Sequence, residues 1–200
     1  MNILILNTSY NRPFSCLVCA GDENKAFFYE DCKSIKHSED TLRTIDKFLT
    51  DASISLKDVD VIAVNLGPGS FTGIRVGVAL AKGFACADPN KKIVAFNSME
   101  QIAQCLNSDN VLLKANNDEF YYGKVEDGKF SIGIVETSSA KGDEYTDETN
   151  FNNMIDASIK VVLNKIDKGE FVSVNELNPI YLKLSQAERE LLKRENNGNN

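Results

Sequence analysis

A glycine-rich turn, Gly67–Gly73 with the sequence GPGSFTG, is the part of the chain whose residue types and spacing could do chemistry. Glycines let the backbone turn sharply, and the exposed N–H groups of such a turn can face an anion. The turn is not a Walker A loop, because Ile74 stands where that motif needs lysine. Close packing of a helix on a sheet would require the same glycines, so both interpretations stay open. The residues of this candidate phosphate-facing turn are Gly67, Gly69, Ser70, Thr72 and Gly73.

Other candidates for catalysis are weak. The chain has one histidine, His37, so a metal site with two histidines cannot be built within it. A structural or interface role at the entry to a helix suits His37 better than the role of a lone general base. Ser70 and Thr72 do not form a G-x-S-x-G nucleophile elbow and are expected to cap the helix that follows.

The cysteines indicate reduced thiols. Their number is odd, and they are spread through apolar segments at Cys16, Cys19, Cys32, Cys86 and Cys105. Cys16 and Cys19 spell C-x-x-C, but they lie in an expected strand, where residues three apart point to opposite faces. A shared metal or redox site is therefore not expected.

Composition excludes two classes of partner. The net charge of -7 predicts that the surface repels a phosphate backbone, so contact with nucleic acid is expected to be indirect. No apolar run approaches the roughly 20 residues that cross a bilayer, and the N-terminus has no basic region of a signal peptide. We therefore expect a cytoplasmic protein without a membrane contact.

The turn is expected to be positioned by an α/β fold. Apolar alternation predicts strands at 2–7, 15–19 and 25–29 with a turn at 21–24, followed by a helix at 38–51 that Ser38 caps. A strand at 60–65, the glycine turn and a helix at 74–87 come next, then a strand at 92–96 and a helix at 98–106. The buried face of the helix at 38–51 is expected to contain Leu42, Ile45, Phe48, Leu49 and Ala52.

The second half has a weaker pattern. Strands are expected at 110–114, 119–125 and 129–135, with a hairpin at Asp127-Gly128. Residues 137–153 are polar, 158–163 suit either a strand or a helix, and 185–188 resemble a capping box. We therefore divide the chain into an N-terminal lobe (1–97), a smaller C-terminal lobe (98–195) and a disordered tail (196–200).

Gly73, Gly77 and Ala81 recur at every fourth residue of the helix at 74–87. Such a smooth stripe lets another element approach closely. The sequence does not decide whether that element belongs to this chain or to a partner.

The stretch GPGSFTGIRVG, from Gly67 to Gly77, resembles the signature of the TsaB (YeaZ) family. The resemblance extends to the opening residues 3–9, to His37-Ser38-Glu39 and to Pro179-Ile-Tyr-Leu182. It departs from the family at Asn7, where aspartate is usual, and at Lys114-Ala115-Asn116, where Asp-Ala-Arg is common. Asn7 weakens the case for magnesium-nucleotide chemistry, because ASKHA enzymes use an acidic residue there.

The resemblance implies an ASKHA (actin/HSP70-like, ribonuclease H-like) fold with a mixed sheet and a reduced second lobe. It also implies a non-catalytic subunit that docks on a TsaD-type catalytic subunit, joins a TsaE-type ATPase and reaches tRNA only through the complex, for threonylcarbamoyladenosine modification near the anticodon. ATP and a metal would belong to the partner subunits, and an isolated chain could form a homodimer. The alternative is an independent ASKHA-type ATPase or small-molecule kinase. The residues expected at the partner interface are Leu42, Ile45, Gly73, Gly77 and Ala81.

Overall fold

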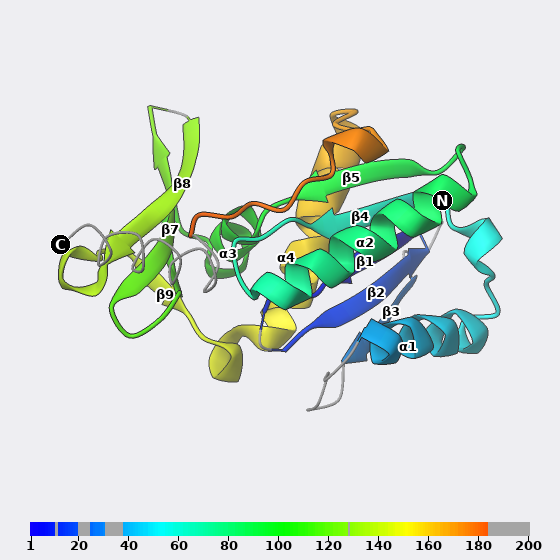
Figure 1. Cartoon of the computed structure of the whole chain (residues 1–200), viewed down its shortest axis with the longest axis horizontal. Coiled ribbons are helices and arrows are strands. Elements are labelled where there is room, and N and C mark those ends of the chain that lie inside the picture. Colours follow the sequence, from blue (N-terminus) through cyan, green and yellow to red (C-terminus); the bar gives the residue numbers. More distant parts are fainter. Residues whose placement is uncertain (11, 20–24, 31–37, 128, 184–200) are drawn as a thin grey trace, which may run out of the picture.

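The computed structural model describes residues 1–10, 12–19, 25–30, 38–127 and 129–183 (Figure 1). Several expectations concern residues outside these ranges: the role of His37, the environment of Cys32, the turn at 21–24, Gly128, the capping box at 185–188 and the tail at 196–200. They stay predictions.

The first lobe is built on a five-stranded sheet with the order β3-β2-β1-β4-β5. Strands β1 (Asn2–Asn7), β2 (Phe14–Cys19) and β3 (Lys25–Glu30) pair antiparallel, and β4 (Val61–Asn65) and β5 (Lys92–Phe96) continue the sheet in parallel with β1. The mixed sheet predicted from the sequence is confirmed. Parallel strands end at the same edge, so this order places the ends of β1 and β4 beside each other.

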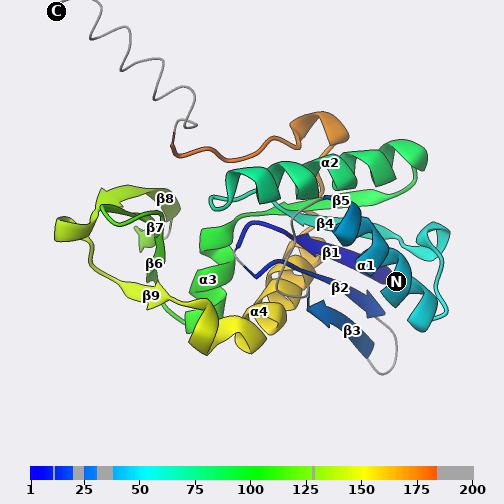
Figure 2. The ribbon, with the colours of Figure 1, turned by 60° about the horizontal axis from the view of Figure 1, so that its bottom comes forward.

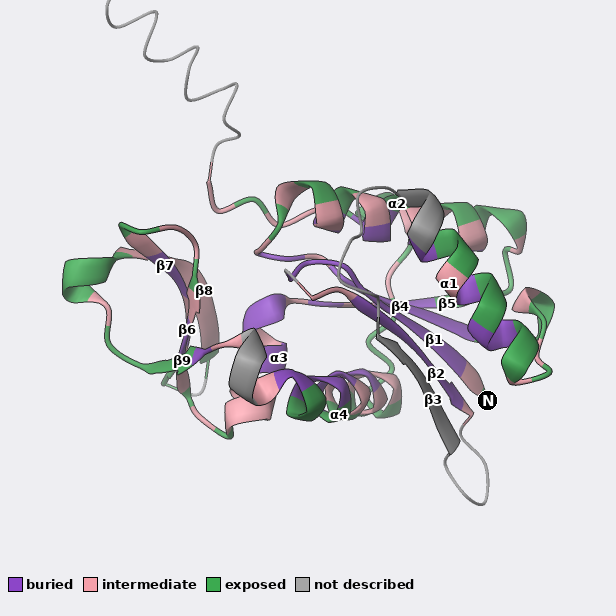
Figure 3. Ribbon diagram, turned by 90° about the horizontal axis from the view of Figure 1, so that it is seen from below, coloured by how far each residue is buried: buried purple, intermediate pink, exposed green. Residues whose placement is uncertain are grey.

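Helices cover both faces of this sheet (Figures 2 and 3). Helices α1 (Ser38–Asp51) and α2 (Phe71–Ala87) lie on one face, and α4 (Asp147–Asp167) lies on the other. Alternate residues of β1 supply both cores: Leu4 and Leu6 pack toward α1 and α2, whereas Ile3 and Ile5 pack toward α4. The sheet is therefore buried on both sides, as its nearly continuous apolar strands require.

The second lobe is a four-stranded sheet with the order β8-β7-β6-β9. Its strands are β6 (Asn110–Lys114), β7 (Glu119–Glu126), β8 (Lys129–Glu136) and β9 (Asp143–Tyr145). Helix α3 (Ser98–Leu106) connects the two sheets, and its Met99 and Ile102 join Val111 of β6 in a core shared with α4. Asp127 has a φ of 50°, which suits the tight turn between β7 and β8.

Two helices differ from the sequence predictions. Helix α2 begins at Phe71 instead of 74, because Ser70 serves as its N-cap and accepts a hydrogen bond from Gly73 N. Helix α4 begins at Asp147, within the polar stretch 137–153, and includes residues 158–163, for which the sequence left a strand and a helix open. Its buried residues Phe151, Met154 and Ser158 follow helical spacing, and packing against both lobes stabilises a helix whose first turn is polar.

The face of α1 that packs on the sheet also needs a correction. Ile45, Phe48 and Leu49 are buried, as predicted, but Leu42 is 43% exposed. Thr41 takes the sheet-facing position instead, because it lies four residues before Ile45 and is 4% exposed. Leu42 thus faces solvent.

The chain returns to the first lobe after α4. Val172 N donates a hydrogen bond to Ile93 O at 3.0 Å, and Ile180 N donates one to Leu66 O at 2.8 Å. Leu177 lies between these two points and is fully buried in the core under α1 and α2. The two sheets lie on either side of residue 97 in the sequence, whereas α4 packs against both lobes and residues 172–180 return to the first lobe.

The described cysteines are free thiols, and Cys16 and Cys19 pack on opposite faces of the sheet as predicted. Burial raises the pKa of Cys16 to about 12 and that of Cys105 to about 11, so neither is a thiolate near neutral pH. Among the described residues, no helix combines the length and the apolar character needed to span a bilayer.

Candidate functional site

Two asparagines meet where β1 and β4 end. Leu6 pairs with Val64 in the parallel register, so Asn7 and Asn65 follow on adjacent strands. Both are fully buried, and Asn65 Nδ2 donates a hydrogen bond to Asn7 Oδ1 at 3.2 Å. This position lies between the two lobes, next to the glycine turn.

Gln101 of α3 is the centre of the hydrogen bonds around these asparagines. Its Oε1 accepts from Asn7 Nδ2 at 2.9 Å, from Asn65 Nδ2 at 3.1 Å and from the hydroxyl of Tyr10 at 3.2 Å. Its Nε2 donates to Met154 O at 3.1 Å and to Ser158 Oγ, both on α4. One buried amide therefore joins β1, β4 and α4.

Two serines complete this buried network. Ser9 Oγ donates to Asn7 Oδ1 at 3.0 Å, and Ser98 Oγ lies 3.1 Å from Asn65 Oδ1 and 3.2 Å from Ser9 Oγ. The polar atoms between the lobes are thus satisfied by one another, as buried polar groups must be. Thr41 Oγ1, which lies on α1 and outside this network, is the buried side-chain oxygen without a partner in the described part of the chain.

This arrangement does not fit a magnesium nucleotide. Magnesium prefers carboxylate, phosphate and water oxygens, whereas the network consists of amides and hydroxyls. The side-chain N–H groups of Asn7, Asn65 and Gln101 are already donated within the chain. A ligand would have to displace these hydrogen bonds to enter.

The glycine turn closes over the same network. Gly67 has a φ of 94° and its N–H donates to Asn65 Oδ1 at 2.8 Å. Ser70 N donates to Ser9 O at 2.7 Å, and a side chain at Gly69 would collide with that carbonyl group. The amides of Gly67, Ser70 and Gly73 thus bind acceptors of this chain, and the phosphate-facing role of the turn stays a prediction.

The small-residue stripe of α2 faces the chain's own sheet. A Cβ at Gly73 would collide with the carbonyl of Thr8, and one at Gly77 would lie 2.5 Å from Thr8 Oγ1. Ala81 is fully buried, and Ile45 of α1 is 3% exposed. The four residues Gly73, Gly77, Ala81 and Ile45 therefore pack inside the molecule, and their assignment to a partner interface needs correction. Of the expected interface residues, Leu42 is on the surface.

The opposite side of α2 is exposed and contains mostly small side chains. We call it the outer face of α2. Gly83 has no neighbour within 4 Å of an added Cβ, so no contact of the described chain explains a glycine there. The outer face consists of Thr72, Arg75, Ala79, Gly83 and Cys86.

The second departure from the family pattern, Lys114-Ala115-Asn116, lies at the end of β6. Asn116 Nδ2 donates to Glu119 Oε2 at 3.1 Å, and Glu119 also forms an ion pair with Lys183. The carboxylate of Glu119 is thus paired with a lysine from the returning chain, which joins the loop after β6 to residue 183. Lys114 is exposed.

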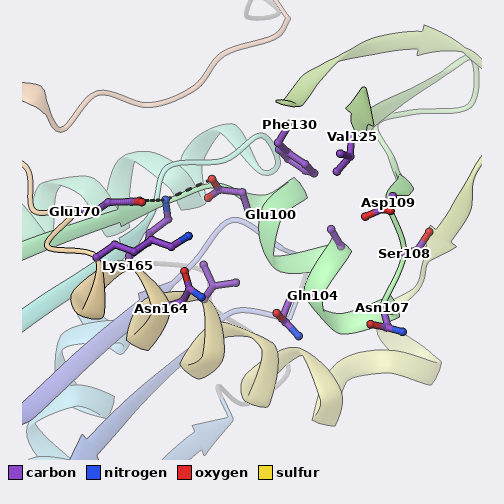
Figure 4. A pocket seen from close by; sticks show the side chains of 13 residues that line it. Glu100, Gln104, Asn107, Ser108, Asp109, Val125, Phe130, Asn164, Lys165 and Glu170 are labelled. Carbon is purple, nitrogen blue, oxygen red and sulfur yellow. Dashed lines mark hydrogen bonds and ion pairs between the residues drawn. The ribbon is translucent and has the colours of Figure 1, made fainter. Parts of the chain in front are cut away.

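A separate open pocket of about 650 Å³ lies between α3, α4 and the β7–β8 hairpin (Figure 4). Lys165 pairs there with Glu100 at 3.4 Å and with Glu170 at 3.1 Å. Burial alone would lower the pKa of Lys165, but these two carboxylates raise it above its usual value. The pocket wall is therefore an internal ion-pair network, with Val125 and Phe130 opposite.

Sequence patterns identified part of the site. Asn7 was noticed because it departs from the family, and the glycine turn because of its composition. Asn65, Ser98, Gln101 and Ser158 were missed, because amide and hydroxyl residues far apart in sequence have no recognisable spacing. A signal existed at Asn65, since it ends the strand that leads into the glycine turn.

The chain was compared with known proteins. Residues 31–173 match the family model described as TsaD, tRNA N6-adenosine threonylcarbamoyltransferase. The TsaB protein of Haemophilus influenzae is 28% identical over 131 residues, which are 62% of this chain and 54% of that protein. The TsaB protein of Escherichia coli is 35% identical over 85 residues, 42% of this chain and 36% of that protein. Both are described as tRNA threonylcarbamoyladenosine biosynthesis proteins.

Solved structures show the same fold. YeaZ from Pseudomonas aeruginosa superimposes with a TM-score of 0.71 at 20% identity, covering 90% of this chain and 99% of that one. The matched segment spans about half or less of the length of the curated TsaB relatives above. The family model covers most of the described chain, and the expected ASKHA-type fold is confirmed. The chain belongs to the family of the TsaD model, and it is similar to the TsaB (YeaZ) proteins.

Proposed function

We propose that this chain is a non-catalytic subunit for threonylcarbamoyladenosine modification of tRNA. It binds a TsaD-type catalytic subunit, and through that subunit it meets a TsaE-type ATPase and tRNA. The observation that carries the proposal is the buried network of Asn7, Asn65 and Gln101, which fills the position between the lobes with neutral, mutually bonded side chains. ATP and a metal then act in the partner subunits, and the chain works in the cytoplasm.

The outer face of α2 is the surface that supports partner binding. Glycine inside a helix costs about 1 kcal/mol relative to alanine. Gly83 has no neighbour that requires it, and its φ is not among the positive values of the chain. Close approach of another molecule explains a glycine at an exposed helix position, because a side chain would hold the two backbones apart.

The experiment is light scattering coupled to size-exclusion chromatography, with this chain alone and mixed with the TsaD-type protein of the same organism. We expect a 1:1 complex with the wild-type chain and loss of the complex with Gly83→Leu. Asn153→Leu is the matched control, because Asn153 is exposed on α4, on the opposite face of the sheet. Gly83→Leu should keep the fold, since the added side chain enters open space.

Each other outcome has a defined meaning. Absence of a complex with the wild-type chain, together with ATP hydrolysis by the chain alone, would favour an independent ASKHA-type ATPase or small-molecule kinase. A complex that forms equally with Gly83→Leu would leave the subunit role in place and exclude the outer face of α2. A chain that forms only a homodimer, with or without the second protein, would contradict the proposal.

A further inference from the structure

Arg75, Phe71 and Tyr181 form a cluster at the exposed start of α2. The Phe71 and Tyr181 rings stack with centroids 4.6 Å apart and an interplanar angle of 27°. The Arg75 Cζ atom lies 4.0 Å from the Phe71 centroid, and Arg75 Nε donates a hydrogen bond to the Tyr181 hydroxyl at 2.8 Å. Tyr181 is 42% exposed although its ring is fixed on both the helix and the arginine.

This geometry fixes a guanidinium group at the surface before any ligand binds. An arginine that is already held by an aromatic ring and a hydroxyl loses less side-chain entropy on binding than a free one. Arg75 is exposed and forms no ion pair with a carboxylate among the described residues, and its hydrogen bond to Tyr181 uses Nε and leaves the two Nη groups out of that bond. Such groups match a carboxylate in bidentate geometry.

The charge of α2 supports an anionic ligand. The helix contains Arg75 and Lys82 and no acidic residue, although the chain as a whole has a net charge of -7. Arginine and tyrosine are also the residues that most often dominate binding energy in protein interfaces. Arg75 and Gly83 both belong to the outer face of α2, Arg75 near the start of the helix and Gly83 nearer its end.

We propose that Arg75, held by Phe71 and Tyr181, binds a carboxylate on the surface of the TsaD-type subunit and anchors the complex. This inference rests on the proposed function and adds the chemistry of the contact. A protein carboxylate suits the cluster better than tRNA, because binding of a phosphate backbone needs several cations and the chain has a net charge of -7. The two rings also stack on each other, which uses the surfaces that a base would need.

Calorimetric titration of the TsaD-type subunit with variants of this chain tests the contact. We expect Arg75→Ala to weaken binding at least tenfold, and Arg75→Lys to weaken it by a similar factor, because lysine cannot make the bidentate pair. Tyr181→Phe keeps the stacked ring and removes the acceptor for Nε, so a loss of about threefold is expected. Lys160→Ala is the control, because it removes one positive charge from exposed α4. Wild-type affinity should fall with added salt more steeply than that of Arg75→Ala.

The outcomes separate this inference from the proposed function. Binding by the wild-type chain with unchanged affinity for Arg75→Ala would overturn the anchor and leave the subunit role intact. No binding by the wild-type chain would overturn both. Direct binding of tRNA by the isolated chain that Arg75→Ala abolishes would show a phosphate contact and also overturn the inference. Thermal unfolding of each variant, followed by circular dichroism, confirms that the fold is retained.

Discussion

Asn7 shows how one atom changes the chemistry between the two lobes. An aspartate would offer two acceptor oxygens at this position, whereas Asn7 offers one acceptor and one donor. The donor faces Gln101 Oε1, which already accepts two further hydrogen bonds. Gln101 cannot reverse its amide group without losing its bonds to Met154 O and Ser158 Oγ. The network therefore selects an amide at residue 7.

Asn7→Asp is expected to destabilise the chain by about 2–4 kcal/mol, because it removes a buried hydrogen bond and places a carboxylate beside Gln101 Oε1. Urea unfolding followed by circular dichroism measures the change. Asn152→Asp on the exposed side of α4 is the control and should stay within about 0.5 kcal/mol of wild type. A variant Asn7→Asp that is as stable as wild type and binds magnesium ATP would contradict the structural role of Asn7.

At the residue scale, sequence patterns predicted local geometry better than buried hydrogen bonds between distant side chains. The N-capping role of Ser70 and the opposed side chains of Cys16 and Cys19 followed from local geometry and were confirmed. The partners of Gln101 could not be predicted, because hydrogen bonds between residues up to 94 positions apart depend on the complete fold.

The two sides of α2 serve different purposes, and glycine occurs on both. Gly77 allows the helix to approach Thr8, whose hydroxyl donates to Gly73 O at 2.7 Å. Gly83 lies on the solvent side with no neighbour within 4 Å of an added Cβ. Replacing each of these two glycines by alanine therefore compares the same substitution on the buried side and on the solvent side of one helix.

Gly77→Ala should lower the free energy of unfolding by about 1–3 kcal/mol, because the new methyl group would lie 2.5 Å from Thr8 Oγ1. Gly83→Ala should raise it by up to about 1 kcal/mol, since alanine favours the helix and meets open space. Urea unfolding of the two variants measures both changes. Equal effects of the same sign would contradict the orientation of α2.

Most element bounds of the first lobe could be predicted from the sequence because each strand is short, apolar and followed by a clear helix or turn signal. The strands β1 and β5 and the helix α1 have the predicted bounds, and so does α3, which follows directly after this lobe. Helix α4 was recognised in part, because its first residues are polar and its apolar positions from Phe151 onward are shared between two cores. Its stability comes from packing that local sequence does not show.

At the scale of the whole molecule, α4 and Gln101 join the two lobes. Helix α4 contributes Met154 to the core of the second lobe and Val162 to the core beneath the first sheet. Gln101 connects β1 and β4 to α4. We therefore expect the chain to unfold in one cooperative transition.

Gln101→Leu should lower the free energy of unfolding by about 3 kcal/mol or more, because Asn7, Asn65 and Tyr10 would lose a shared acceptor in a buried site. Gln104→Leu on the exposed side of α3 is the control. Thermal unfolding followed by circular dichroism and by tyrosine fluorescence should give coincident curves for wild type. Two separate transitions in wild type, or equal effects of the two variants, would contradict this coupling.

The division into lobes at residue 97 stays a prediction; β1 to β5 form one sheet before that residue and β6 to β9 form the other after it. The return of residues 172–180 to the first lobe could not be foreseen, because the burial of Leu177 depends on packing against residues of α1 and α2 that are far away in the sequence.

The buried position of Leu177 has a consequence for the order of events during protein synthesis. Once residue 96 has been synthesised, the chain contains all five strands of the first sheet and the helices α1 and α2. The core between them still lacks Leu177, which is added only after most of the chain has been translated. Val162, on the other face of the sheet, is also a late residue. The first lobe therefore cannot complete its packing during early translation. The core of the first lobe is completed only after the second lobe has been translated, so an unfinished chain lacks part of the packing that stabilises this lobe.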